Sequence, residues 1–213
     1  AKKMLQQEGM NIPMVTTLHG TDITLVGNHP FYKPAVTFSI NKSDYVTSVS
    51  KSLKEDTLRL FTIKRDINVI PNFIEQGNIK EGFTDCQRDL MAQPHERIIT
   101  HISNMRAVKC IPDVIKVFAK IQEEIPAKLI MVGEGPEREP GENLCDELGI
   151  GKKVVWLGNS NEIDKILCFS DLFLLPSRAE SFGLAALEAM AHGVPVVSSN
   201  AGGLSEVNVN GIS

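Results

Sequence analysis

Short apolar runs alternate with longer amphipathic stretches along most of the chain. Many of the apolar runs are rich in β-branched residues and predict buried strands, over 14–18, 45–49, 67–70, 97–102, 127–132, 153–157, 172–175 and 194–198. The stretches between them predict helices, over 31–42, 51–61, 111–124, 137–148, 161–169 and 183–192. Ser50 is placed to cap the second of these helices. The alternation predicts an α/β fold with parallel sheets that helices cover on both faces.

The pattern breaks down into polar, glycine-containing sequence between Phe73 and Glu96. We therefore expect two Rossmann-like units, over 1–75 and 97–213, joined by a linker region over 76–96. The chain begins within a helical pattern and stops where a further strand should follow. We accordingly expect the first unit to be incomplete and the second to lack its end.

The composition narrows the class of protein. The 213 residues are 42% hydrophobic and carry a net charge of -4, without a basic block, which argues against nucleic acid as a partner. No apolar run is long enough to predict a membrane span. The four cysteines form no CxxC pair, so we expect isolated thiols and a cytoplasmic location rather than a disulfide framework or zinc site.

Polar loops follow several of the predicted strands, where parallel sheets bind ligands. The loop after 97–102 carries Arg106 and Lys109, which fit a phosphate clamp or, alternatively, a solvated basic loop. After 127–132, Gly133-Glu134-Gly135 allows close approach of a ligand to the backbone, without the GxGxxG pattern of dinucleotide sites. After 153–157, the turn Gly158-Asn159-Ser160-Asn161 is placed to read a base edge, or alternatively Ser160 or Asn161 is placed to cap a helix.

The stretch 177–197 predicts a loop, a helix, and a Gly-Pro turn into a strand. Glu180 precedes the helix, Glu188 lies within it, and Gly183 leaves room at its start. The N-terminus of a helix presents unpaired N–H groups and partial positive charge, which suits an anionic or sugar-hydroxyl ligand. Together with the three loops, this stretch predicts a nucleotide-sugar site.

The segment from Glu180 to Glu188, followed by Ala-Met-Ala-His-Gly-Val-Pro-Val, resembles the Glu-x7-Glu signature of retaining glycosyltransferase family 4. The resemblance extends through 132–136, 201–206 and 103–109 and covers nearly the whole chain. Within the family, 17–24, 71–74 and 101–106 are most similar to the branch that transfers N-acetylglucosamine from UDP to L-malate in bacillithiol biosynthesis.

The resemblance implies a GT-B fold, retention at the anomeric carbon, and no obligatory metal or other cofactor. It implies UDP-N-acetylglucosamine and a small carboxylate acceptor as partners, and leaves a homo-oligomer open. The catalytic residues would be His19, over the reacting sugar, and Glu180, at the sugar hydroxyls. Thr21 would face the acceptor, and Lys109 falls on the family's pyrophosphate lysine. The other expected donor-binding residues are Asn104 (where the family usually has arginine), Arg106, Gly133, Glu134, Gly135, Asn159, Ser160, Phe182, Gly183, Leu184 and, at the ribose, Glu188.

Alternatives remain open at this point. Pro176-Ser177-Arg178 resembles the wider family more than the malate branch, so another acceptor (a lipid-linked sugar, a polysaccharide or inositol phosphate) is the first alternative. A non-catalytic nucleotide-sugar binding module and a sugar epimerase are the others. Retention fits either front-side attack or double displacement with Glu180 as nucleophile. Of the remaining histidines, His29, His95 and His192 are expected on the surface or in turns, and His101 in the core or cleft with its hydrogen bonds satisfied.

Overall fold

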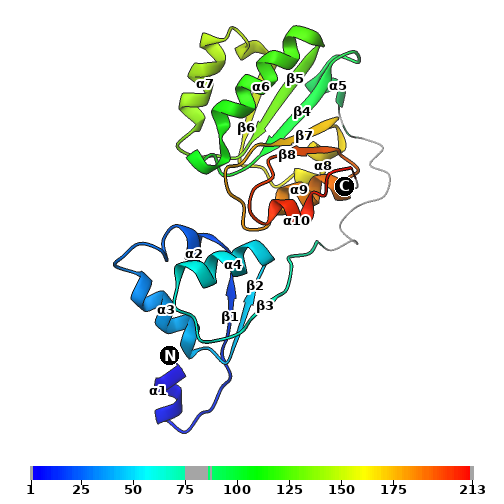
Figure 1. Cartoon of the computed structure of the whole chain (residues 1–213). Helices are drawn as coiled ribbons and strands as arrows, with labels where there is room; N and C mark the ends of the chain where they lie inside the picture. The colour runs from blue at the N-terminus through cyan, green and yellow to red at the C-terminus, as the bar shows by residue number, and fades with distance from the viewer. Residues whose placement is uncertain (1, 75–85, 87, 212–213) are drawn as a thin grey trace. The chain divides into compact units, whose positions relative to one another are not determined.

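A computed structural model describes residues 2–74, 86 and 88–211 (Figure 1). The chain divides into two compact units, one of residues 1–72 with 180–182, the other of residues 73–179 with 183–213. Among the described residues, no helix has both the length and the apolar composition that crossing a membrane requires.

The first unit contains a parallel sheet in the order β1-β2-β3. Its strands are β1 (Val15–Leu18), β2 (Tyr45–Ser48) and β3 (Ile67–Val69). Its helices are α1 (Lys2–Gln7), α2 (Thr21–Thr24), α3 (Lys33–Lys42) and α4 (Lys51–Leu60). Ser50 caps α4 as predicted, since its Oγ accepts the N–H of Leu53 at 3.1 Å.

The second unit contains a parallel sheet in the order β6-β5-β4-β7-β8. Its strands are β4 (Arg97–Ile102), β5 (Ala127–Val132), β6 (Val154–Gly158), β7 (Leu172–Leu175) and β8 (Val196–Ser198). Its helices are α5 (Arg88–Met91), α6 (Ile111–Glu124), α7 (Arg138–Glu147), α8 (Ile163–Cys168), α9 (Leu184–Ala191) and α10 (Leu204–Val207), with short 3-10 turns at η2 (Ala107–Lys109) and η3 (Gly151–Lys153). The predicted parallel α/β architecture is confirmed.

Neighbouring residues of β4 pack on opposite faces of this sheet. Ile99 lies in a buried cluster with Phe118 of α6, and Ile98 lies in another with Ile166 of α8. Because successive side chains of a strand point to opposite faces, a strand covered on both sides directs apolar residues toward both, as β4 does with Ile98 and Ile99. Figure 1 shows α6 and α7 on one face and α8, α9 and α10 on the other.

Much of the predicted linker over 76–96 lies outside the described residues, which omit 75–85 and 87. α5 belongs to the second unit and is held there by Arg88. The guanidinium of Arg88 donates to the carbonyl oxygens of Phe169 at 2.6 Å and Glu96 at 2.9 Å, and to the Asp171 carboxylate at 2.7 Å. This arginine fastens α5 to the start of β4 and to the turn before β7.

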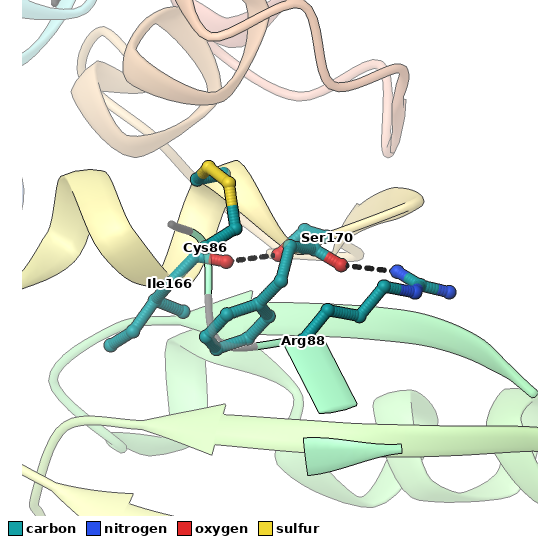
Figure 2. Close-up of a disulfide and its surroundings, with 6 residues drawn as sticks. Cys86, Arg88, Ile166 and Ser170 are labelled. Atoms are coloured by element: carbon teal, nitrogen blue, oxygen red, sulfur yellow. Dashed lines mark hydrogen bonds between the residues drawn. A yellow bond between two sulfur atoms is a disulfide. The ribbon is translucent and has the colours of Figure 1, made fainter. Parts of the chain in front are cut away.

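A disulfide joins Cys86 to Cys168, the last residue of α8, with their Cα atoms 5.6 Å apart (Figure 2). The prediction of isolated thiols is wrong for this pair, which is separated by 82 residues. Sequence spacing does not show which cysteines the fold brings within bonding distance. Cys110 and Cys145 are free, as predicted, and both are buried.

Candidate functional site

The order of the strands creates a topological switch point in the second sheet, between β4 and β7. The chain runs from β4 outward through β5 to β6, then returns to the other side of β4 as β7 and continues to β8. The loops that follow β4 and β7 therefore lead away in opposite directions. In open parallel sheets, ligands bind outside the carboxyl ends of the strands at such a switch point. The loops after β4 and β7 are those that carry the predicted cations and Glu180.

The loops after β4 and β5 are bound to each other through their backbones. The N–H of Ser103 donates to Val132 O at 3.0 Å, and the N–H of Met105 donates to Glu134 O at 2.9 Å. Gly133 adopts a φ of 113°, and a Cβ there would collide with the carbonyl oxygen of Ser103. The position therefore requires glycine for this close approach of the two loops. The predicted phosphate clamp and the predicted glycine loop thus form one backbone-bonded surface.

The two predicted cations lie within and beside η2. Lys109 is the last residue of η2, and Arg106, which immediately precedes η2, is exposed. The N–H of Arg106 donates to Asn104 O at 2.6 Å, and the N–H of Lys109 donates to Arg106 O at 2.8 Å. This short turn holds the three predicted residues in one compact loop at the carboxyl end of β4.

His101 lies buried just behind this loop, as predicted, with both ring nitrogens satisfied. Its Nδ1 lies 2.8 Å from Leu174 O, and its Nε2 lies 2.8 Å from Ser103 Oγ. Burial lowers the pKa of His101 to about 4, the Leu174 contact opposes this, and the positive charge of Lys109 adds to it. The ring is therefore neutral at pH 7, where Nδ1 donates to the carbonyl and Nε2 accepts from the serine hydroxyl.

The loop after β7 is bound to the loop after β4. The N–H of Arg178 donates to Val108 O at 2.8 Å. Glu180 follows two residues later, is half-buried, and belongs with Phe182 to the short segment grouped with the first unit. The β7 loop thus places the predicted sugar-binding carboxylate on the same chain segment that meets η2.

α9 begins where the sequence predicts a ligand-facing helix end. Gly183, with a φ of 97°, is its N-cap, and a Cβ there would lie 2.5 Å from Leu204 Cδ1. The N–H groups of Ala186 and Leu187 both donate to Gly183 O. The N–H of Leu184 therefore precedes the first helical hydrogen bond and has no acceptor within the helix.

Glu188 lies one turn further along α9 and is half-buried. Burial raises the pKa of its carboxyl above the usual range, the Asp164 carboxylate adds to this, and His192 opposes it. The contacts of Asp164 and His192 were missed by the sequence reasoning. The signal was present in part, since Glu188 and His192 are four residues apart and share one face of α9.

His192 lies in the turn after α9, as one of the two predicted alternatives requires, while its side chain is only 9% exposed. It follows the last residue of α9 and folds back under the helix, with Nδ1 2.8 Å from Glu188 O. His95 and His29 are exposed, as predicted.

Two of the remaining predicted donor residues, Glu134 and Ser160, have local partners. The Glu134 carboxylate forms an ion pair with Arg138 in α7. Ser160 Oγ accepts the N–H of Glu162 at 3.1 Å, so it caps the turn that leads into α8. Gly135 lies between Glu134 and α7, and Asn159 is exposed after β6. No side chain caps α8 itself, so the predicted alternative that Ser160 caps this helix is wrong.

His19 and Thr21 lie in the first unit, at the carboxyl end of β1 and the start of α2. Both are exposed. Asp22 shapes this turn, because its carboxylate accepts the N–H groups of Gly20 at 2.7 Å and His19 at 3.2 Å. Among the residues that the structure describes, no cluster of three or more His, Cys, Asp or Glu side chains is arranged to hold a metal ion.

Family models match both parts of the chain. Residues 85–213 match the model described as Glycosyl transferases group 1, and residues 2–76 match Glycosyltransferase Family 4. The chain is 43% identical to N-acetyl-alpha-D-glucosaminyl L-malate synthase of Bacillus anthracis, over 99% of this chain and 55% of that protein. It is 35% identical to an uncharacterized glycosyltransferase of Methanocaldococcus jannaschii, over 94% of this chain and 56% of that protein.

A solved structure shares the fold. HepE from Anabaena, crystallised with UDP and glucose, superposes with a TM-score of 0.81 at 22% identity, over 94% of this chain and 56% of that one. The chain thus spans about half the length of the proteins it matches. The expected two-unit architecture of these enzymes is confirmed.

Proposed function

The chain belongs to the group 1 and family 4 glycosyltransferases, and we propose that it transfers N-acetylglucosamine from UDP-N-acetylglucosamine to L-malate with retention at the anomeric carbon. The observation that carries the proposal is the pairing of a cationic loop after β4 with a carboxylate-bearing loop and helix end after β7, at the switch point of the second sheet.

The charges of these two loops match the parts of a nucleotide sugar. Arg106 and Lys109 supply positive charge for the diphosphate, and the N–H of Leu184 at the start of α9 offers a donor to the same group. Glu180 and Glu188 supply acceptors for the hydroxyls of the sugar and the ribose. HepE, of the same fold, was crystallised with UDP, which supports this class of donor.

The reaction breaks the bond between the sugar and the diphosphate, so negative charge develops on the departing UDP. Lys109, Arg106 and the end of α9 would stabilise that charge, which makes an obligatory metal unnecessary in this proposal. His19, from the first unit, would contact the reacting sugar, and Thr21 would contact the acceptor. The proton of the attacking malate hydroxyl would pass to the departing phosphate in a front-side attack.

The acceptor rests on the relative of Bacillus anthracis, whose name gives L-malate as its substrate. The corresponding place of action is the cytoplasm and the corresponding process is bacillithiol biosynthesis. Because Cys86 and Cys168 form a disulfide, the cysteines do not support a cytoplasmic location. The proposal of that location rests only on the water-soluble nucleotide-sugar donor.

The decisive experiment measures UDP release from UDP-N-acetylglucosamine with a panel of acceptors, in the presence and absence of EDTA. Release that depends on malate and continues in EDTA supports the whole proposal. Release that depends on a different acceptor would retain the donor half and replace the acceptor. A protein that does not bind UDP by calorimetry would overturn the proposal.

A second candidate is a transferase of the same donor with another acceptor, such as inositol phosphate, a polysaccharide or a lipid-linked sugar. It is favoured by Pro176-Ser177-Arg178, the one stretch that resembles the wider family more than the malate branch. The same panel separates the two.

A further inference from the structure

The segment 180–182 follows β7 in the chain but belongs to the first unit, and its backbone is held there by Ser50. The hydroxyl group of Ser50 donates a hydrogen bond to the carbonyl oxygen of Ser181 at 2.6 Å. Ser50 lies in the loop between β2 and α4 and is 1% exposed. Because water does not reach so deeply buried a hydroxyl, loss of this bond would leave a polar group unsatisfied.

The position of the Ser50 hydroxyl is itself fixed by α4. Its oxygen accepts the N–H of Leu53 at 3.1 Å, which caps the helix. A hydroxyl group has one hydrogen to donate and two lone pairs that accept. The cap uses a lone pair, so the hydrogen is directed to Ser181 without competition from the helix. The carbonyl oxygen of Ser50 also accepts from the hydroxyl of Ser48 at 2.9 Å, which holds the residue from the strand side.

Gly20 makes a second close approach to the same segment. It is the N-cap of α2 and adopts a φ of 130°. A Cβ at this position would lie 2.5 Å from the Cβ and 2.7 Å from the Oγ of Ser181. Only glycine therefore allows the turn after β1 to lie against the segment. α2 and α4, the helices into which the two loops lead, lie side by side (Figure 1).

These contacts bring the two predicted catalytic residues together. His19 immediately precedes Gly20 in the chain, and Glu180 immediately precedes Ser181. Because adjacent Cα atoms are about 3.8 Å apart, both predicted residues lie one residue away from the contact between Gly20 and Ser181. The resemblance assigns His19 and Glu180 to the same reacting sugar. A packed backbone contact beside them is therefore placed to set their spacing.

We propose that Ser50 is a positioning residue of the transferase site, because its hydroxyl fixes the backbone of Ser181 and thereby holds Glu180 beside the turn that carries His19. The inference rests on the proposed function, in which Glu180 and His19 contact the reacting sugar. Ser50 itself is assigned no contact with donor or acceptor and acts through the Ser181 carbonyl. A displacement of a sugar-binding group by about 1 Å is enough to lower turnover substantially.

The first test measures the hydrogen bond itself, in the full chain without ligand. Carbonyl-carbon NMR reports the loss of a hydrogen bond to a carbonyl oxygen as a shift of the carbon signal. The Ser181 carbonyl signal should move in Ser50→Gly and Ser50→Ala, and should stay near its wild-type position in Ser50→Thr, which keeps the hydroxyl. A signal that is unchanged in Ser50→Gly would overturn the inference, whatever the protein binds.

The second test separates positioning from helix capping. Glycine is nearly as good an N-cap as serine, whereas alanine is a poor one. Ser50→Gly and Ser50→Ala should therefore lower kcat alike, by about tenfold, although only the alanine variant should unfold at a clearly lower temperature. Ser50→Thr should retain kcat. A fall of kcat in Ser50→Ala alone would show that the cap, and not the bond to Ser181, supports turnover.

Thr57→Val is the matched control. Thr57 is a fully buried residue of the same helix, and its hydroxyl donates to Leu53 O at 2.7 Å rather than to the segment 180–182. The variant removes one buried hydrogen bond of α4, so it should lower the unfolding midpoint and leave kcat unchanged. If Thr57→Val lowers kcat as much as Ser50→Gly, turnover follows the stability of α4 and the inference fails.

UDP binding distinguishes this role from the proposed function. UDP lacks the sugar that Glu180 would hold, so its affinity by calorimetry should be the same in the wild type and in Ser50→Gly. A weaker affinity in Ser50→Gly would contradict a role confined to the sugar. If the wild-type chain does not bind UDP, the proposed function fails and Ser50 has no catalytic role, even where the carbonyl shift is found. If the wild type turns over and Ser50→Gly turns over equally fast, only the role of Ser50 is refuted.

Discussion

The peptide N–H of Arg178 donates to the carbonyl oxygen of Val108 at 2.8 Å. This bond joins the loop after β7 to the loop after β4, although Arg178 and Val108 are 70 residues apart in the chain. It holds the residues just before Glu180 against the turn that ends at Lys109. The sugar end and the phosphate end of the proposed donor site are therefore assembled by backbone contacts, which side-chain substitutions leave in place.

Replacing Lys109 by alanine should lower kcat severely, by about 100-fold or more, because the charge on the departing diphosphate loses its stabilising cation. The backbone bonds of the loop do not depend on the side chain, so the thermal unfolding midpoint should change little. Steady-state UDP release and thermal unfolding measure the two effects. Lys116→Ala, at an exposed position of α6, is the matched control. Near-normal turnover in Lys109→Ala would show that its assigned role is wrong.

Glu180→Gln tests the two retaining routes. If Glu180 is a nucleophile, the amide cannot form the covalent intermediate, and turnover should vanish while UDP still binds. If Glu180 only holds the sugar hydroxyls, the amide keeps some hydrogen bonding, and turnover should fall severely but stay measurable. Single-turnover kinetics with mass spectrometry of the protein distinguishes these results. Unchanged turnover would exclude both roles.

The free energy of unfolding should fall as the pH is lowered from 7 to 5, and His101 should contribute to that fall. The pKa of His101 is about 4 in the fold against its ordinary value of 6.5, so near pH 5 the unfolded chain binds a proton that the folded chain does not. This contribution is complete above pH 6.5 and is lost as the pH falls toward 4. The loss between pH 7 and pH 5 should be about 2 kcal/mol.

Urea unfolding of the wild type and of His101→Gln at both pH values measures the effect. The contribution of His101 is the difference between the two proteins in how much the free energy of unfolding changes with pH. NMR titration of the ring provides an independent reading where the variant is too unstable. A ring that titrates near 6.5 in the folded chain would contradict the prediction.

Reduction of the disulfide between Cys86 and Cys168 should lower the free energy of unfolding by about 2–4 kcal/mol, because the intact disulfide closes a long loop in the unfolded chain. Urea unfolding with and without dithiothreitol measures the effect. The variant Cys86→Ser with Cys168→Ser should match the reduced wild type and be insensitive to the reductant. If the reductant lowers the free energy of unfolding of the variant as much as that of the wild type, the effect does not come from this disulfide.

Arg88 should keep α5 in place after reduction. Its guanidinium binds Phe169, Glu96 and Asp171 independently of the sulfur atoms. The loss of the disulfide therefore changes stability without detaching α5 from the second unit, and the proposed donor site, built at the other loops, should retain its affinity for UDP.

Local pattern was sufficient to predict the longer helices and the strands. The apolar run of β4 and the three-to-four spacing of α6 are properties of neighbouring residues, and both elements lie where the sequence predicts them. The short helices α2, α5 and α10 were missed, because a single helical turn has too few residues to show a period. His101 was also predicted correctly, since a histidine inside an apolar strand must be buried with its hydrogen bonds satisfied.

The sequence by itself determined the α/β class, the family and the loops that carry the proposed donor-binding residues, because these depend on residues close together in the chain. Tertiary structure alone decided that β7 returns beside β4, that Cys86 meets Cys168, and that Asp164 meets His192. Each of these pairs brings together segments far apart in the chain. Their contact depends on how whole elements pack, and the order of residues along one strand or helix does not contain that information.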